Sequence, residues 1–181
     1  MVNIYELKLT LLQQEILRLF FRKAGLRLNA RAVARAAGVS QPAVSKALPA
    51  LEKSGFLKVE RDRETGRLSI ELNRDSREVI WLKRADNLRH LYESGLVQYF
   101  YDRLPGSVVI LFGSYAFGED TAKSDIDIAV IGQKKEMETG KFEKMLERPV
   151  IINHYRSFKD IDKHLLNNIL NGITLKGAVE L

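Results

Sequence analysis

Hydrophobic residues recur at helical spacing along the start of the chain. Residues 4–24 place their apolar positions on one helical face, namely Leu9, Leu12, Ile16, Leu19 and Phe20. Gly25 ends this predicted helix. Asn29 is a suitable N-cap for a second, shorter helix over residues 30–37.

The next residues have the chemistry of a tight turn between two helices. Gly38 can adopt the left-handed conformation that such a turn needs. Ser40 is a good N-cap for a third helix, and Pro42 is tolerated in its first turn. Pro49 lies further along the same helix, where it removes a backbone donor and crowds the carbonyl of Ser45. We therefore expect a kink or an early end at Pro49.

Two runs of alternating apolar and polar residues follow Gly55. Leu57 and Val59 share one face of the first run, and the return run does the same with Leu68, Ile70 and Leu72. Between them, residues 61–67 read RDRETGR. The pattern predicts a hairpin with a charged tip.

Together these elements resemble the winged helix-turn-helix domain of small bacterial and archaeal regulators. The resemblance implies that residues 1–73 bind double-stranded DNA. The residues that would read base edges are at the start of the third helix, namely Gln41, Ser45 and Lys46. The wing arginines, which would contact phosphate or the minor groove, are Arg61, Arg63 and Arg67. The alternative is a winged helix that serves dimerisation or protein docking.

The charge distribution favours the DNA interpretation. The net charge is +6. Residues 1–73 hold 13 Lys and Arg against 7 Asp and Glu, whereas residues 74–181 hold 16 of each. A basic module joined to a neutral one is typical of a protein whose first part meets a polyanion, although a solvated basic face would have the same charge.

Residues 74–104 predict a helical connector. Charges and large apolar residues alternate at helical spacing, with a break near Ser94-Gly95 and an end at Pro105-Gly106. The aromatic content favours packing against both modules, or a homodimer seam, over a loose linker.

A second pattern, after residue 105, combines apolar strands with polar residues. The apolar run 108–112 predicts a buried strand, and Gly113-Ser114 follows it directly. Asp125 and Asp127 lie two apart in the next apolar strand, so their carboxylates share a face. The two carboxylates raise each other's pKa unless a cation or proton intervenes. Mg²⁺ accepts one or two protein carboxylates, and takes its other ligands from water and a triphosphate.

The spacing of Gly113-Ser114 and Asp125-x-Asp127 resembles the signature of the DNA polymerase β-like nucleotidyltransferase superfamily. It is most similar to the minimal nucleotidyltransferases of bacteria and archaea. The resemblance implies that Gly113 and Ser114 hold the triphosphate of an NTP, with ATP the first candidate. It makes Asp125 and Asp127 catalytic ligands of Mg²⁺ or Mn²⁺. Lys123, in the loop between the two motifs, is either a further phosphate ligand or a solvated loop lysine.

The expected fold is therefore α+β. It has a winged helix-turn-helix domain (1–73), a helical connector (74–104) and a small α/β nucleotidyltransferase domain with a mixed sheet (105–181).

Active members of this superfamily carry a third carboxylate on a later strand. The candidate strand here, residues 148–155, contains no Asp or Glu. Asn153 offers an uncharged oxygen, His154 is a candidate proton acceptor or a structural residue, and Glu147 precedes the strand. The sequence therefore supports metal and nucleotide binding better than turnover.

Two further interpretations concern the rest of this domain. Glu119 and Asp120 are expected in a solvated loop. Residues 157–160 resemble a capping box at the start of a helix that covers the sheet and ends near Asn171-Gly172.

Three functions remain open. The first is a DNA-binding enzyme that transfers a nucleoside monophosphate to an unknown acceptor, such as the helical toxin-like proteins that minimal nucleotidyltransferases modify. The second is a transcriptional regulator or antitoxin whose degenerate nucleotidyltransferase fold serves sensing or dimerisation. The third is a non-enzymatic scaffold.

Cellular location follows from what the sequence lacks. It has no cysteine, which excludes disulfides and thiolate metal sites. No apolar run approaches the roughly 20 residues of a membrane span, and the N-terminus does not read as a signal peptide. We expect a cytoplasmic protein with no membrane partner.

Overall fold

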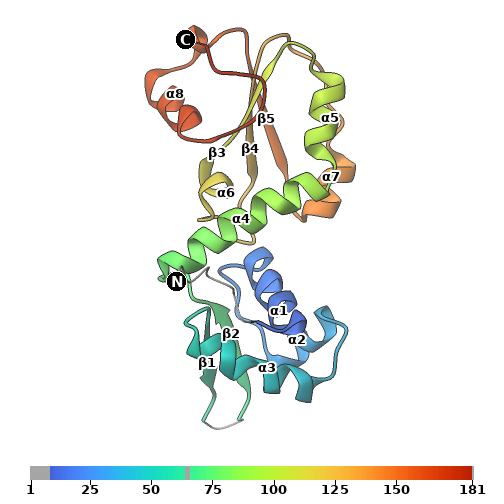
Figure 1. The fold of residues 1–181 in the computed structure, drawn as a ribbon, viewed down its shortest axis with the longest axis vertical. Coiled ribbons are helices and arrows are strands. Elements are labelled where there is room, and N and C mark those ends of the chain that lie inside the picture. Colours follow the sequence, from blue (N-terminus) through green and yellow to red (C-terminus); the bar gives the residue numbers. More distant parts are fainter. Residues whose placement is uncertain (1–8, 64–65, 181) are drawn as a thin grey trace, which may run out of the picture. The chain divides into compact units, whose positions relative to one another are not determined.

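The computed structural model describes residues 9–63 and 66–180. The chain divides into two compact units, Met1–Val79 and Ile80–Leu181, each described here by itself (Figure 1). No helix in the described ranges is long and apolar enough to cross a membrane.

The first helix, α1 (Leu11–Arg22), is fixed at its start by a capping box. The Thr10 hydroxyl accepts from the Gln13 amide at 3.3 Å, and the Gln13 side chain accepts from the Thr10 amide at 2.8 Å. Because these two bonds satisfy amides at the helix end, the helix begins at Leu11. The predicted start at residue 4 lies outside the described residues, but residues 9 and 10 are not helical.

Both predicted caps of the helix-turn-helix are confirmed. Asn29 Oδ1 accepts from the Ala32 amide at 2.8 Å and begins α2 (Ala30–Ala36). Ser40 Oγ accepts from the Ala43 amide at 3.3 Å and begins α3 (Gln41–Lys53). Gly38, in the turn between them, has φ +64°.

The predicted early end at Pro49 is wrong, because α3 continues through it to Lys53. Leu48 and Leu51 on either side are buried, while Pro49 itself is exposed. Burial of these leucines therefore keeps the helix in place despite the backbone hydrogen bond that Pro49 cannot donate to Ser45.

The predicted hairpin is present as β1 (Leu57–Arg61) and β2 (Leu68–Leu72), paired antiparallel from Leu57↔Leu72 to Arg61↔Leu68. Leu28 adds a bridge to Ile70, with N···O distances of 2.8 and 2.9 Å. The order of helices, bridge and hairpin is that of a winged helix-turn-helix domain. Residues 64 and 65 of the wing lie outside the described residues.

The predicted connector forms α4 (Arg77–Glu93) and α5 (Leu96–Arg103), separated at Gly95 with φ +78°. The break near Ser94-Gly95 is thus confirmed. Leu91, Phe100 and Leu104 belong to the core of the second unit. This segment therefore contributes to the body of that unit and does not act only as a link.

A mixed four-stranded sheet, as expected, organises the second unit. Its order is β5 (Val150–Tyr155), β4 (Ile126–Ile131), β3 (Val108–Phe112) and β6 (Ile173–Lys176). The β5–β4 pair is parallel and the other two pairs are antiparallel. Two short helices, α6 (Gly113–Phe117) and α7 (Gly140–Leu146), and strand β6 were not anticipated from the sequence.

Side chains from the two faces of this sheet enter two separate cores. One core joins β3 and β4 to α5 and α7. The other joins the opposite face to the 3-10 helix η1 (Phe158–Asp160) and to α8 (Lys163–Leu170). The capping box at Ser157 begins η1, whereas Asp162 caps α8, so the covering helix starts later than predicted.

We predict that Pro49→Ala stabilises the first unit. The substitution restores a backbone donor inside α3 without removing buried surface, because Pro49 is exposed. The free energy of unfolding should rise by about 1–3 kcal/mol. Chemical denaturation monitored by circular dichroism measures this change. As a control, Ser40→Ala should lower it by about 1 kcal/mol. An unchanged or lower stability for Pro49→Ala would contradict the account of α3.

Candidate metal and nucleotide site and candidate DNA surface

A backbone bend at the end of β3 lies against a carboxylate. Gly113 has φ +73°, and a Cβ built on it would lie 2.5 Å from Asp127 Oδ2. A side chain at this position is excluded both by the backbone conformation and by the neighbouring oxygen. The Gly113 backbone and the Asp127 carboxylate therefore lie closer together than a side chain at position 113 would allow.

Sheet pairing produces this proximity. Asp127 on β4 pairs with Phe112 on β3, the residue that precedes Gly113. Asp125 lies just before β4 and is exposed, whereas Asp127 is half-buried. Asp125 is near enough for its charge to act on the Asp127 carboxyl.

The electrostatics of this pair are unfavourable without a counterion. Burial raises the pKa of the Asp127 carboxyl above its ordinary value, and the negative charge of Asp125 raises this pKa further. A divalent cation would relieve both effects. Asp125 and Asp127 thus fit a magnesium-type ion that takes its remaining ligands from water and phosphate. Within residues 9–63 and 66–180, no group of three or more His, Cys, Asp or Glu forms a fuller metal cage.

The residue beside Asp127 on the neighbouring strand is apolar. In the parallel β4–β5 pair, Asp127 pairs with Ile151, which is 43% exposed. Paired residues of adjacent strands point to the same face. Ile151 therefore occupies the β5 position from which a side chain could join Asp125 and Asp127.

The structure corrects the two polar candidates on β5. Asn153 pairs with Ala129, two residues farther along the strand from Asp127. His154 pairs with Val130, which enters the core on the opposite face, so His154 is not directed to the carboxylate pair. Burial, followed by the positive charge of Lys134, lowers the pKa of His154. Asn153 therefore lies on the face of the sheet that carries Asp127, two residues away from it, whereas His154 lies on the other face.

The other predicted nucleotide ligands lie close in the chain. Ser114 follows Gly113 in the first turn of α6, whose N-cap Phe112 has no side-chain acceptor to offer. First-turn amides have no partner within their own helix, which leaves them suited to an anion. Lys123 is exposed two residues before Asp125.

Asp120 overturns the expectation of a solvated loop. Its side chain is 0% exposed and forms an ion pair with the buried Lys83 of α4. No local pattern predicts this pair, because 37 residues separate its members. Glu119, in contrast, is exposed.

In the first unit, a basic notch lies between the helix-turn-helix and the wing. Its volume is about 570 Å³. Four predicted DNA-binding residues line it, namely Gln41, Ser45, Arg61 and Arg67. Asn29 and Arg31 also line it and were not anticipated. Arg31 is an exposed cation at the start of α2, and only the fold reveals that it faces the wing.

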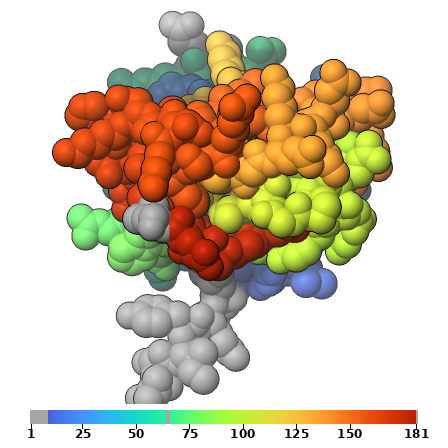
Figure 2. All heavy atoms as spheres, turned by 90° about the horizontal axis from the view of Figure 1, so that it is seen from above, coloured from blue at the N-terminus to red at the C-terminus, as the bar shows by residue number. Residues whose placement is uncertain are grey.

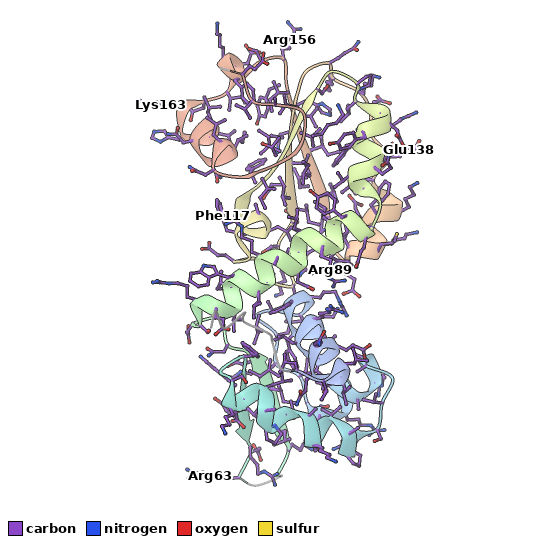
Figure 3. All side chains as sticks on the ribbon, viewed as in Figure 1. Arg63, Arg89, Phe117, Glu138, Arg156 and Lys163 are labelled. Atoms are coloured by element: carbon purple, nitrogen blue, oxygen red, sulfur yellow. The ribbon has the colours of Figure 1, made fainter. Side chains whose placement is uncertain are left out.

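Two predicted DNA ligands lie outside this notch. Lys46 is exposed on α3, and Arg63 is exposed beside the tip of the wing, where it points away from the hairpin (Figure 3). They extend the basic surface without lining the cavity.

The second unit has two further cavities. One, of about 600 Å³, is lined by the β4–α7 loop and by Val150, Ile152 and His154 of β5. The other, of about 500 Å³, includes Ser107, Arg156 and the C-terminal segment. Figure 2 shows that segment (red) beside α5 (yellow-green). Neither cavity is lined by Asp125 or Asp127.

A family comparison supports the assignment of the second unit. Residues 96–177 match the family model described as polymerase beta, nucleotidyltransferase. This segment is a nucleotidyltransferase-like domain. It includes β3, the Gly113-Ser114 bend and both aspartates. No match was found among curated proteins.

Solved structures resemble the chain more distantly. The adhesin competence repressor AdcR from Streptococcus pyogenes is 24% identical, with 54% of this chain and 69% of that chain covered and a TM-score of 0.41. ZitR, a zinc-responsive MarR family member from Lactococcus lactis, is 20% identical, with 56% and 67% covered and a TM-score of 0.41. MepR from S. aureus, solved as a DNA complex, is 22% identical, with 52% and 80% covered and a TM-score of 0.37. The winged-helix description rests on the element order above and not on these scores.

We predict that Asp127→Asn stabilises the metal-free second unit at neutral pH. The folded-state pKa of Asp127 is raised, so the unfolded chain releases its proton first as the pH rises above about 4. The wild-type free energy of unfolding therefore falls through this interval, and Asp127→Asn removes that loss. Its melting temperature should be about 1–3 °C higher at pH 7, with a smaller gain near pH 4.

Thermal unfolding in EDTA across this pH range measures the effect. Asp102→Asn is the matched control, because Asp102 is exposed on α5 and should give no such gain. A lower stability of Asp127→Asn at pH 7 would show that the carboxylate is not under electrostatic strain.

Proposed function

We propose that the second unit binds a nucleoside triphosphate together with Mg²⁺ or Mn²⁺. The observation that carries this proposal is the approach of the Gly113 backbone to Asp127, which a side chain would block. Asp125 and Asp127 would hold the metal, while the Gly113 and Ser114 amides and the Ser114 hydroxyl would contact phosphate oxygens. Lys123 would add a positive charge to the same ligand.

The reaction that this site would support is nucleotidyl transfer. An acceptor hydroxyl gives up its proton to solvent and its oxygen bonds to the α-phosphorus, while the bond from the α-phosphorus to the oxygen that bridges to the β-phosphorus breaks and pyrophosphate leaves with that oxygen. A bound metal ion would neutralise the negative charge of the phosphates. The protein residues orient the triphosphate and hold its oxygens in place. A helical protein is the acceptor class that we propose.

Ile151 favours a second candidate function. An isoleucine beside Asp127 cannot take the proton of an acceptor hydroxyl or add charge to the metal site. Transfer would then be slow or absent. The domain would act as a nucleotide sensor or dimerisation module of a transcriptional regulator or antitoxin, in which a homodimer is the assembly we propose.

We propose that the first unit binds double-stranded DNA. Arg31, Arg61 and Arg67 surround the notch, and Gln41 and Ser45 stand at the exposed N-terminal end of α3. Cations at this position suit phosphate, while the polar side chains of α3 suit base edges in the major groove. The excess positive charge of residues 1–73 supports the same partner.

Calorimetry with Mn²⁺ and a non-hydrolysable ATP analogue tests the nucleotide proposal. Wild-type protein should show saturable binding of the analogue. The double variant Asp125→Asn/Asp127→Asn should bind it at least 10-fold more weakly, because each change removes a charged metal ligand. Asp102→Asn should bind like the wild type. If the wild type, the double variant and Asp102→Asn all give the same heat of binding, the proposed site is refuted.

We predict that Ile151→Asp strengthens Mn²⁺ binding about 10-fold, because it places a third carboxylate beside Asp127. Ile151→Asn is the matched control and should give a smaller gain. Labelled ATP then separates the two functions. Slow wild-type transfer that Ile151→Asp accelerates supports an impaired enzyme, whereas metal binding without transfer in either protein supports the sensor. No gain in affinity would contradict the placement of Ile151.

The DNA proposal predicts a change in salt dependence. Arg31→Ala and Arg61→Ala should each weaken binding to mixed-sequence duplexes and reduce the slope of log affinity against log salt by about 0.9, the contribution of one phosphate contact. Fluorescence anisotropy between 50 and 200 mM salt measures both. Lys53→Ala, an exposed cation at the far end of α3, should leave the slope unchanged. If all three variants behave alike, the notch is not the DNA surface.

A further inference from the structure

The loop that ends at the metal-binding carboxylates has one buried side chain. Of residues 119–125, which connect Gly118 to Asp125, only Asp120 is buried. The loop therefore has almost no apolar anchor of its own. Its position depends on the groups that contact Asp120.

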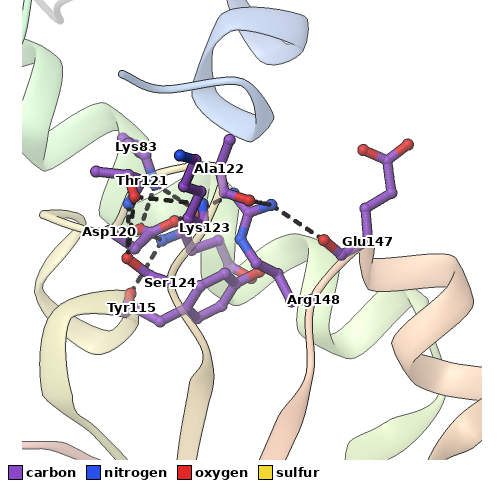
Figure 4. Close-up of polar contacts among 10 residues, drawn as sticks. Lys83, Tyr115, Asp120, Thr121, Ala122, Lys123, Ser124, Glu147 and Arg148 are labelled. Carbon is purple, nitrogen blue, oxygen red and sulfur yellow. Dashed lines mark hydrogen bonds and ion pairs between the residues drawn. The ribbon is translucent and has the colours of Figure 1, made fainter. Parts of the chain in front are cut away.

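Three side chains from two distant segments meet the Asp120 carboxylate (Figure 4). Lys83 of α4 forms an ion pair with it, and Asn87, one turn later, donates to Oδ1 at 2.7 Å. Arg148, two residues before β5, places Nη2 3.5 Å from Oδ2. Lys83, Asn87 and Arg148 are themselves buried, with exposures of 1%, 6% and 5%.

Further contacts extend this hold along the loop. Arg148 Nη1 donates to the Ala122 carbonyl at 3.3 Å. At the near end, a Cβ on Gly118 would lie 2.5 Å from the Ile80 carbonyl, so the chain runs against the α4 backbone. At the far end, a turn from Thr121 to Ser124 delivers the chain to Asp125, with the Thr121 amide donating to Ser124 Oγ at 3.0 Å.

Burying the charged groups of Asp120, Lys83 and Arg148 together costs hydration free energy, which is unfavourable if the contact only stabilises the fold. Buried ion pairs are rarely better stabilisers than apolar side chains of similar size, because both partners lose their hydration. The hydrogen bonds from Lys83 and Asn87 to Oδ1 are, however, directional, and the positive charge of Arg148 lies near Oδ2, so together these groups hold the carboxylate in one position. An apolar side chain at residue 120 would fill the space without this restriction.

We propose that Asp120, held by Lys83 and Arg148, is the positioning residue of the metal site. It fixes the loop so that Asp125 stands beside Asp127 and opposite Gly113. The proposal rests on the metal-nucleotide function proposed above and names the residues that make that site rigid. Asp120 itself would not contact a bound metal, because its carboxylate is buried among the three side chains.

Asp120→Asn and Lys83→Met test the proposal. The first keeps the shape of the side chain and removes its charge. The second is the milder change, since Asp120 keeps Arg148 and Asn87 as partners, and it decides the question if Asp120→Asn does not fold. Leu175→Ala is the matched control, because Leu175 on β6 is a buried residue in the core of the second unit.

Two readouts separate positioning from stability. In metal-free protein, hydrogen exchange at amides 119–126 should be at least 10-fold faster in Asp120→Asn and Lys83→Met than in the wild type. Leu175→Ala should raise exchange throughout the second unit, with no larger increase at amides 119–126 than elsewhere. The Mn²⁺ dissociation constant, measured by electron paramagnetic resonance well below the melting temperature, should rise about 10- to 100-fold in the first two variants and less than 3-fold in Leu175→Ala.

The outcomes that overturn the proposal are distinct. If all three variants exchange alike and keep the wild-type Mn²⁺ affinity, Asp120 only stabilises the fold. If wild-type protein has no Mn²⁺ site that Asp125→Asn removes, the metal-nucleotide function fails. Hydrogen exchange at residues 119–126 then still decides whether Asp120 fixes the loop.

Discussion

The close approach of a glycine backbone to a carboxylate is the constraint on which the second unit depends. Gly113 is left-handed, and its missing side chain leaves room for Asp127 Oδ2. This proximity requires that β3 end where β4 begins, which the antiparallel Phe112↔Asp127 pair provides. The two other cavities of this unit are not lined by either aspartate.

Strand register also decides what the site lacks. The sequence of β5 offers several polar residues, yet the one that stands beside Asp127 is Ile151. The proposed site therefore combines two candidate metal ligands with an apolar neighbour at the position where a proton acceptor would assist transfer. Binding of a metal-nucleotide complex at this site therefore does not imply nucleotidyl transfer. A regulatory role is for this reason an alternative to an enzymatic one.

Local signals were sufficient for much of this chain. Asn29, Ser40 and Gly95 mark helix boundaries through their own hydrogen bonds or backbone preference. Long-range features were not predictable in this way. Predicting that Ile151 pairs with Asp127 requires the register of two strands. Predicting that Asp120 is buried requires knowledge of its partners Arg148 and Lys83, which are 28 and 37 residues away. Pro49 shows the same limit, since tertiary burial of its neighbours overrides its local preference.

The most direct test of the central claim is a crystal structure grown with Mn²⁺ and a non-hydrolysable ATP analogue, with data collected for the anomalous signal of manganese. The account predicts an anomalous peak within bonding distance of both Asp125 and Asp127, with phosphate oxygens against the Gly113 and Ser114 amides. A nucleotide bound elsewhere, or an aspartate pair that contacts only protein cations under these conditions, would contradict it.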